Sequence, residues 1–127
     1  MNENDISFAI RGAAFDVHNY FGPGLFESVY EAALAKNLSG KGFAVERQVG
    51  IPVEYLGENL GLGFIADLIV NNKIVVEIKS VSALHDVHYK QLLTYLRLTN
   101  LKLGLLINFN ETSLATSIKR VVNGLSE

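Results

Sequence analysis

The chain contains no cysteine, which excludes a disulfide, a zinc–thiolate site and a thiol nucleophile. It has no long apolar run either, because the longest, Ile74–Val76 and Leu103–Ile107, are far too short to cross a bilayer. Residues 1–5 are polar and acidic, so we expect neither a secretory signal nor an Arg-rich transit peptide. These absences predict a soluble, cytoplasmic protein with no membrane partner.

Positive charge is also scarce: 11 Lys and Arg stand against 13 Asp and Glu, a net charge of −2 at pH 7. Proteins that hold long duplex nucleic acid unaided are usually basic, because neutralising phosphates supplies much of the affinity. Such binding here would need a bound cation or a local patch. The candidates for a patch are scattered along the sequence: Arg47, Lys73, Lys90 and Arg97.

The chain does have the length and composition of one folded domain. Its 127 residues are 49% hydrophobic, which suits a packed core and argues against disorder. No Pro/Ser-rich or charged linker divides the chain, so we predict a single domain over residues 1–127.

The spacing of apolar residues predicts an α/β fold. Helical spacing covers residues 4–21, 26–39, 87–99 and 114–122, with Asp86 as the N-cap of the third helix. Strand patterns cover residues 43–48, 51–55, 62–70, 74–80 and 101–109, with Pro52 at an edge or a bulge and a turn over residues 57–61. This order predicts a central mixed β-sheet flanked by helices on both faces.

Two acids and a lysine lie on the hairpin of residues 62–80, where a strand should bury apolar groups: Asp67, Glu77 and Lys79. Side chains alternate along a strand, so Glu77 and Lys79 share a face. Asp67 joins that face only if the connecting loop, Asn71–Lys73, has three residues or a bulge. Asparagine tolerates the left-handed conformation that such a loop requires. We therefore predict that the two carboxylates lie about 5 Å apart at their Cβ atoms.

Two carboxylates at so short a distance repel each other unless a cation lies between them. With the backbone carbonyl of Ile78 and waters they would form an octahedral magnesium site, beside which Lys79 could orient a water or balance a phosphate charge. The alternative is an ordinary cross-strand ion pair on a solvent-exposed face.

Two further groups of residues bear on this choice. His88, Gln91 and Tyr95 lie near one stripe of the helix at 87–99, which would otherwise be a polar stripe facing water. Gly24, Glu27 and Tyr30 open the helix at 26–39, where a glutamate also suits the helix dipole.

The ordered set of an Asp, a Glu-x-Lys about ten residues later and a Gln-x-x-x-Tyr on the next helix resembles the RecB-like branch of the PD-(D/E)xK nuclease superfamily. Gly24-x-x-Glu27-x-x-Tyr30 is similar to the signature of the GxxExxY proteins of that superfamily. The resemblance covers nearly the whole chain, up to Gly104–Phe109. It departs at Ala66, where the motif's first residue is proline.

This resemblance implies a restriction-endonuclease-like core and a phosphodiester cleavage site that depends on Mg²⁺ or Mn²⁺. Asp67 and Glu77 would be metal ligands, with Glu27 as a further ligand, directly or through a water. Lys79 would act with the attacking water, while Gln91 and Tyr95 would position the site or the nucleic-acid backbone. His88 either lines the site or lies on the helix surface, and His18 and His85 are interpreted as structural.

The leading hypothesis is therefore a metal-dependent nuclease acting on DNA or RNA, with a homodimer or a partner protein enlarging its surface. Two alternatives stay open. One is a nuclease-like fold used as a binding or assembly module with little catalysis. The other is hydrolysis of a smaller phosphate ester, which would remove the objection raised by the net charge.

Overall fold

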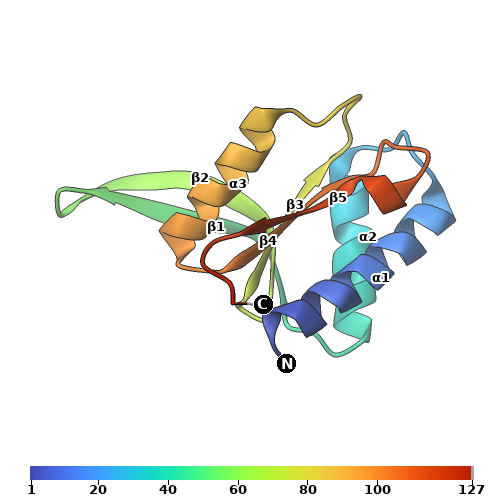
Figure 1. The fold of residues 1–127 in the computed structure, drawn as a ribbon, viewed down its shortest axis with the longest axis horizontal. Helices are drawn as coiled ribbons and strands as arrows, with labels where there is room; N and C mark the ends of the chain where they lie inside the picture. The colour runs from blue at the N-terminus through green and yellow to red at the C-terminus, as the bar shows by residue number, and fades with distance from the viewer. Residues whose placement is uncertain (127) are drawn as a thin grey trace.

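A five-stranded mixed sheet forms the centre of the computed structural model, which describes residues 1–126. The strands lie in sequence order, and all neighbours are antiparallel except β3 and β4, which are parallel. A parallel pair needs a crossover, and α3 supplies it (Figure 1). The strands are β1 (Val45–Tyr55), β2 (Glu58–Val70), β3 (Ile74–Lys79), β4 (Leu103–Asn108) and β5 (Ile118–Val122).

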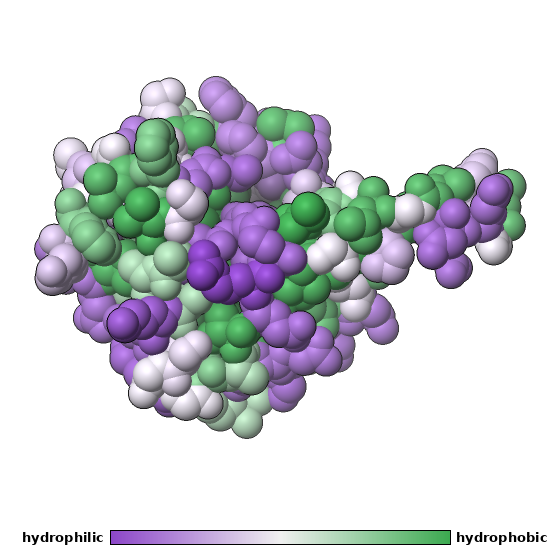
Figure 2. Space-filling view, turned by 180° about the vertical axis from the view of Figure 1, so that it is seen from behind, coloured by the Kyte–Doolittle hydropathy of each residue, from purple (hydrophilic) through white to green (hydrophobic). Residues whose placement is uncertain are grey.

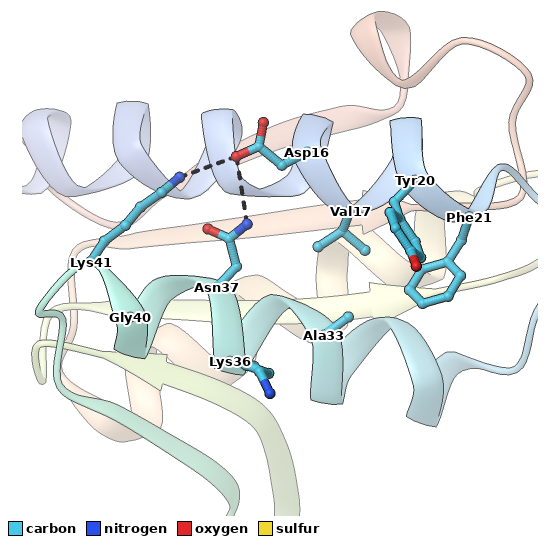
Figure 3. Close-up of a pocket in the computed structure, with 9 residues that line it drawn as sticks. All are labelled: Asp16, Val17, Tyr20, Phe21, Ala33, Lys36, Asn37, Gly40 and Lys41. Atoms are coloured by element: carbon cyan, nitrogen blue, oxygen red, sulfur yellow. Dashed lines mark hydrogen bonds and ion pairs between the residues drawn. The ribbon is translucent and has the colours of Figure 1, made fainter.

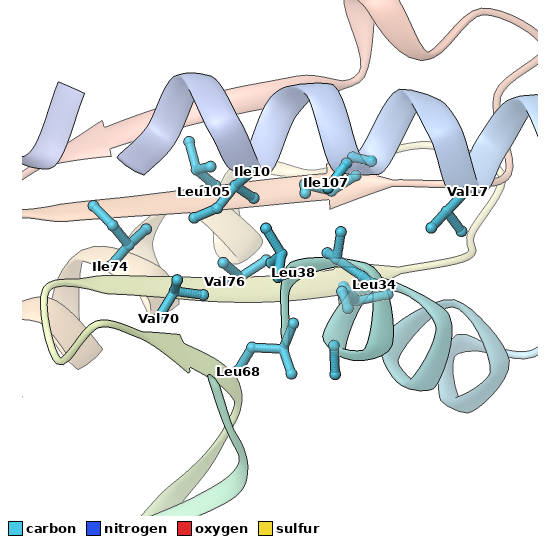
Figure 4. Close-up of a cluster of buried hydrophobic side chains, with 14 of the residues drawn as sticks. Ile10, Val17, Leu34, Leu38, Leu68, Val70, Ile74, Val76, Leu105 and Ile107 are labelled. Atoms are coloured by element: carbon cyan, nitrogen blue, oxygen red, sulfur yellow. The ribbon is translucent and has the colours of Figure 1, made fainter. Parts of the chain in front are cut away.

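Helices cover both faces of this sheet, as the sequence predicts. α1 (Glu3–Phe21) and α2 (Glu27–Gly40) pack on one face, over the larger apolar core shown in Figure 4. α3 (Asp86–Thr99) covers the other face, where its buried residues Leu92 and Leu96 meet a second, smaller core. Each strand of the sheet's centre therefore buries both of its faces. None of the helices within residues 1–126 combines the length and apolarity needed to cross a membrane.

The predicted three-residue loop between β2 and β3 is confirmed. Val70 pairs with Ile74, and the Lys73 amide donates to the Val70 carbonyl at 3.0 Å. Asn71 and Asn72 have φ of 52° and 54°, the left-handed conformation that the loop requires.

The predicted C-terminal helix at 114–122 is wrong. A short 3₁₀ turn (Leu114–Thr116) is followed by β5, which pairs antiparallel with β4. The helical spacing of Leu114, Ile118 and Val122 is genuine, but β4 is buried on both faces and its outer edge needs a hydrogen-bonding partner. Sheet pairing therefore overrides the local pattern.

Three smaller boundaries also differ. The strands predicted at 43–48 and 51–55 are the single strand β1, which is an edge strand with register shifts around Pro52. Residues 58–61 belong to β2 rather than to a turn. The N-cap of α3 is His85, and Asp86 is the first helical residue.

The outer ends of β1 and β2 project from the body as a two-stranded arm, residues 52–62 (Figures 1 and 2). Four large apolar side chains on it are more than half exposed: Tyr55, Leu56, Leu60 and Leu62. The arm carries two acids, Glu54 and Glu58, and no basic residue. Its charge therefore does not favour contact with phosphates.

A cavity built around two carboxylates

Asp67 lies where the pairing of β2 with β3 ends. The last paired residues are Leu68 and Val76, and the same register sets Asp67 opposite Glu77, on one face of the sheet as predicted. Beyond the last backbone pair, the side chain of Asp67 links the two strands, because its Oδ2 accepts a hydrogen bond from the Ile78 amide at 2.8 Å. Asp67 thus holds the end of β3 as well as lining the face of the hairpin.

Glu77 is buried beside Asp67, and one of its two carboxylate oxygens has no hydrogen-bond partner among the described residues. Its side chain is 7% exposed, and no described residue within 1–126 forms a hydrogen bond with its buried Oε1. Burial, and then the charge of Asp67, raises the pKa of Glu77 from 4.5 to about 9, although Lys79 acts in the opposite direction. A buried acceptor next to a second carboxylate is an arrangement that a cation would stabilise.

The strand after Glu77 supplies two further groups. Lys79 follows one pleat along on the same face and lines the same cavity. The Lys79 carbonyl accepts the Phe109 amide of the β4 side at 2.9 Å, whereas the Ile78 amide points to Asp67. The N–H and C=O of one strand residue point to the same side, so the Ile78 carbonyl, like the Ile78 amide, faces the side on which Asp67 lies.

Glu27 reaches the site from the first turn of α2. Gly24, with a φ of 101°, reverses the chain before the helix, and the buried Tyr30 ties this turn together. The Tyr30 hydroxyl donates to the Gly22 carbonyl at 2.6 Å and accepts the Leu25 amide at 3.1 Å. The Glu27 Oε1 accepts the Ser80 amide at 3.3 Å, just past β3. Gly24 and Tyr30 of the motif thus shape the turn, and Glu27 is the residue of the three that lines the cavity.

α3 brings three polar residues to the opposite wall of the cavity: His88, Gln91 and Tyr95. The helix lies close to β4, because Leu92 packs directly on Gly104, where a Cβ would lie 2.9 Å from the leucine. Tyr95 stacks on Phe64 of β2, with ring centroids 3.7 Å apart. Burial, and then the charges of Glu77 and Asp67, raises the pKa of Tyr95, so its hydroxyl keeps its proton.

His88 belongs to the site rather than to the open helix surface. Its Nδ1 accepts the His85 amide at 3.0 Å, which requires an unprotonated Nδ1 and leaves the proton of the neutral ring on Nε2. Burial, and then the charge of Lys79, lowers the pKa of His88. The neutral ring is therefore a hydrogen-bond donor next to the cavity.

The structure thus brings together every predicted site side chain around one cavity of about 360 Å³, hereafter the carboxylate cavity: Glu27, Asp67, Glu77, Lys79, His88, Gln91 and Tyr95. Within residues 1–126, no three histidine or carboxylate side chains form a ready-made metal site. Asp67, Glu77 and the Ile78 carbonyl are hard oxygen donors that fit a divalent cation completed by waters. The direct or water-mediated role of Glu27 stays a prediction.

A polar network that no local sequence pattern predicts borders Asp67 on the β1 side. Buried Glu31 of α2 accepts from Arg47 through two nitrogens, at 3.2 and 3.0 Å, and from the amide of Gln48. The Gln48 amide also lies 3.4 Å from the Asp67 Oδ1. These contacts depend on the pairing of β1 with β2 and on the position of α2, neither of which a local pattern encodes.

A larger cavity of about 750 Å³ lies between α1 and α2 and is a poorer candidate for chemistry (Figure 3). Apolar and aromatic side chains form much of its wall, among them Val17, Tyr20 and Phe21. Its one acid, Asp16, is paired with Lys41 at 3.2 Å and accepts from Asn37. The buried Oδ1 of Asn37 has no hydrogen-bond partner among the described residues, but the cavity holds a single carboxylate that is already paired, whereas the carboxylate cavity brings several carboxylates together.

Comparison of the sequence with known protein families gives a match over most of the chain. A model of the PD-(D/E)XK nuclease superfamily matches residues 4–121 of the chain. This range contains every residue that lines the carboxylate cavity. No curated protein and no solved structure matches the chain.

Proposed function

Because the chain belongs to the PD-(D/E)XK nuclease superfamily, we propose that it is a Mg²⁺- or Mn²⁺-dependent nuclease that cleaves phosphodiester bonds of DNA or RNA at the carboxylate cavity. The observation that carries this proposal is the pair of Asp67 and Glu77, opposed at the end of a hairpin with one buried oxygen of Glu77 unpartnered among the described residues. The Gly24, Glu27 and Tyr30 pattern supports a place among the GxxExxY proteins.

Asp67, Glu77 and the Ile78 carbonyl would hold the divalent ion, which lowers the pKa of a bound water and offsets charge on the phosphate. Lys79 would orient the attacking water or contact a phosphate oxygen from its place one pleat beyond Glu77. Gln91, Tyr95 and the Nε2–H of His88 would donate to the backbone of the nucleic acid from α3.

Cleavage of labelled single- and double-stranded DNA and RNA in Mg²⁺ or Mn²⁺ tests this proposal. Asp67→Ala should abolish cleavage, since it removes a metal ligand. Asp16→Ala is the matched control, because that acid lies in the other cavity, and it should cleave like the wild type. Cleavage that survives in Asp67→Ala would come from a contaminant and would refute the assignment.

A second candidate function is hydrolysis of a smaller phosphate ester. It is favoured by the net charge of −2 and by a cavity of about 360 Å³, which is within the range of small-molecule pockets. Turnover of a small phosphodiester such as bis(p-nitrophenyl) phosphate or a cyclic nucleotide, without cleavage of any polynucleotide, would favour it. Metal binding without turnover of either class would favour a binding module.

A further inference from the structure

Gln48 occupies an irregular position on β1 directly across from Asp67. The flanking pairs are Arg47 with Leu68 and Val49 with Ala66, so the register sets Gln48 opposite Asp67 at a position that the ladder skips. Its φ is 52°, a left-handed conformation that glycine adopts freely and glutamine rarely does. The backbone alone would favour glycine here, so the side chain needs another explanation.

That side chain bridges the carboxylate cavity and the neighbouring buried acid. The Nε2 of Gln48 donates to the Oε1 of Glu31 and lies 3.4 Å from the Oδ1 of Asp67, near the upper limit for a hydrogen bond. The other oxygen of Asp67, Oδ2, accepts the Ile78 amide. Each oxygen of the Asp67 carboxylate therefore faces one donor, which restricts the rotation of the carboxylate.

A role limited to neutralising Glu31 does not account for Gln48. Arg47 already gives Glu31 two hydrogen bonds and a full positive charge. Gln48 is itself exposed, so packing does not hold it in place, and the hydrogen bonds do. Both Arg47 bonds go to the Oε2 of Glu31, so what Gln48 contributes is a donor that joins the other oxygen, Oε1, to the Oδ1 of Asp67.

We propose that Gln48 is a positioning residue that orients the Asp67 carboxylate for a divalent cation, with the Arg47–Glu31 pair as its anchor. This inference rests on the proposed metal-dependent function. A carboxylate oxygen has more than one lone pair, so Oδ1 can accept from Gln48 and still bind an ion. Partners that orient metal ligands from behind commonly change metal affinity by 10- to 100-fold when they are removed.

The experiment compares the Kd of Mn²⁺, measured by calorimetry, with the melting temperature of the metal-free protein. Gln48→Gly should change the melting temperature little, because the relief of the left-handed backbone offsets the lost hydrogen bond to the Glu31 Oε1, yet its Kd for Mn²⁺ should rise about 10- to 100-fold. Gln48→Met keeps the approximate length of the side chain without the amide and should show the same rise. Leu56→Gly is the matched control, since Leu56 has a φ of 51° at the tip of the arm, and its Kd should not change.

The outcomes separate this inference from the proposed function. If the wild type binds Mn²⁺ and Gln48→Gly binds it equally well, the positioning role is refuted and the metal site stands. A fall in the melting temperature of Gln48→Gly that parallels the loss of affinity would assign Gln48 a structural role and also refute it. A wild type that binds no Mn²⁺ at millimolar concentration would overturn the metal site itself and this inference with it.

Discussion

At the scale of single residues, the site is assembled at the expense of stability. Burial is the largest cause of the raised pKa of Glu77, and the negative charge of Asp67 raises it further. The metal-free protein therefore holds a proton on Glu77 near neutral pH. Metal ligands must be deprotonated to bind, and cation binding would therefore displace this proton. The pair is unfavourable for folding alone, and under the proposed function it would become useful when a cation is bound.

This leads to a pH dependence of the metal-free protein. The folded pKa of Glu77, about 9, lies above the ordinary 4.5, so between these values the folded state binds more protons than the unfolded one. The contribution of Glu77 to stability is therefore fully present below about pH 4.5 and is lost as the pH rises toward 9, by up to about 1.4 kcal/mol per pH unit. Glu77→Gln should remove this slope and be more stable at pH 8.

Urea unfolding at pH 6, 7 and 8 in a chelator, followed by circular dichroism, measures this effect. Glu54→Gln on the exposed arm is the control and should keep the wild-type slope. Equal slopes for the wild type and Glu77→Gln would show that Glu77 has an ordinary pKa.

At the scale of elements, the contact of α3 with β4 sets the distance across the carboxylate cavity. A Cβ on Gly104 would lie 2.9 Å from Leu92, whose side chain is fully buried. Gly104→Ala should therefore reduce the free energy of unfolding by about 1–3 kcal/mol through overpacking. Urea unfolding measures it, and cleavage should fall as well because Gln91 and Tyr95 move with the helix.

A second glycine provides the control for that substitution. Gly12 lies inside α1, and a Cβ there would meet nothing within 4 Å. Gly12→Ala should stabilise the protein by about 0.5–1 kcal/mol through helix propensity alone. If both alanine variants had the same effect, the close approach of α3 to β4 would not be the cause.

The arm is an element that stands apart from both cores. Leu56 is 89% exposed and Leu60 is 59% exposed, so neither contributes much buried area. Replacing both with serine should change the free energy of unfolding by no more than about 0.5 kcal/mol. Leu68→Ala, in the core, should cost about 2–5 kcal/mol in the same urea experiment. A large loss in the arm variant would mean that the arm packs against the body in solution.

The elements also show what local sequence encodes. The three-residue length of the Asn71–Lys73 loop and the alternation of side chains along a strand were enough to place Asp67 and Glu77 on one face. Both are properties of a single hairpin. The identity of β5 was not predictable, because it depends on the open edge of β4. Gln48 was missed for the same reason: it looks like any polar strand residue until β1 pairs with β2 across the long arm.

At the scale of the whole molecule, the distribution of charge limits how nucleic acid could bind. Arg47 is paired with Glu31, and Lys73, at the β2–β3 turn, donates to the Met1 carbonyl. Lys90 and Arg97 are exposed and two turns apart on α3, the helix that borders the carboxylate cavity. Even if one nucleic acid contacted both of them and Lys79, it would gain only about three phosphate contacts, so under the proposed function a bound divalent cation would supply much of the remaining attraction.

Nucleic-acid binding should therefore require a divalent cation and depend weakly on salt. About three phosphate contacts predict that log K falls with log salt concentration with a slope no steeper than about −3 for a duplex. Fluorescence anisotropy of a labelled oligonucleotide in Ca²⁺, to slow cleavage, would give this slope, and Lys90→Ala should make it shallower by about one unit. In a chelator the affinity should collapse. Tight binding that resists the chelator and has a slope near −6 would contradict this prediction.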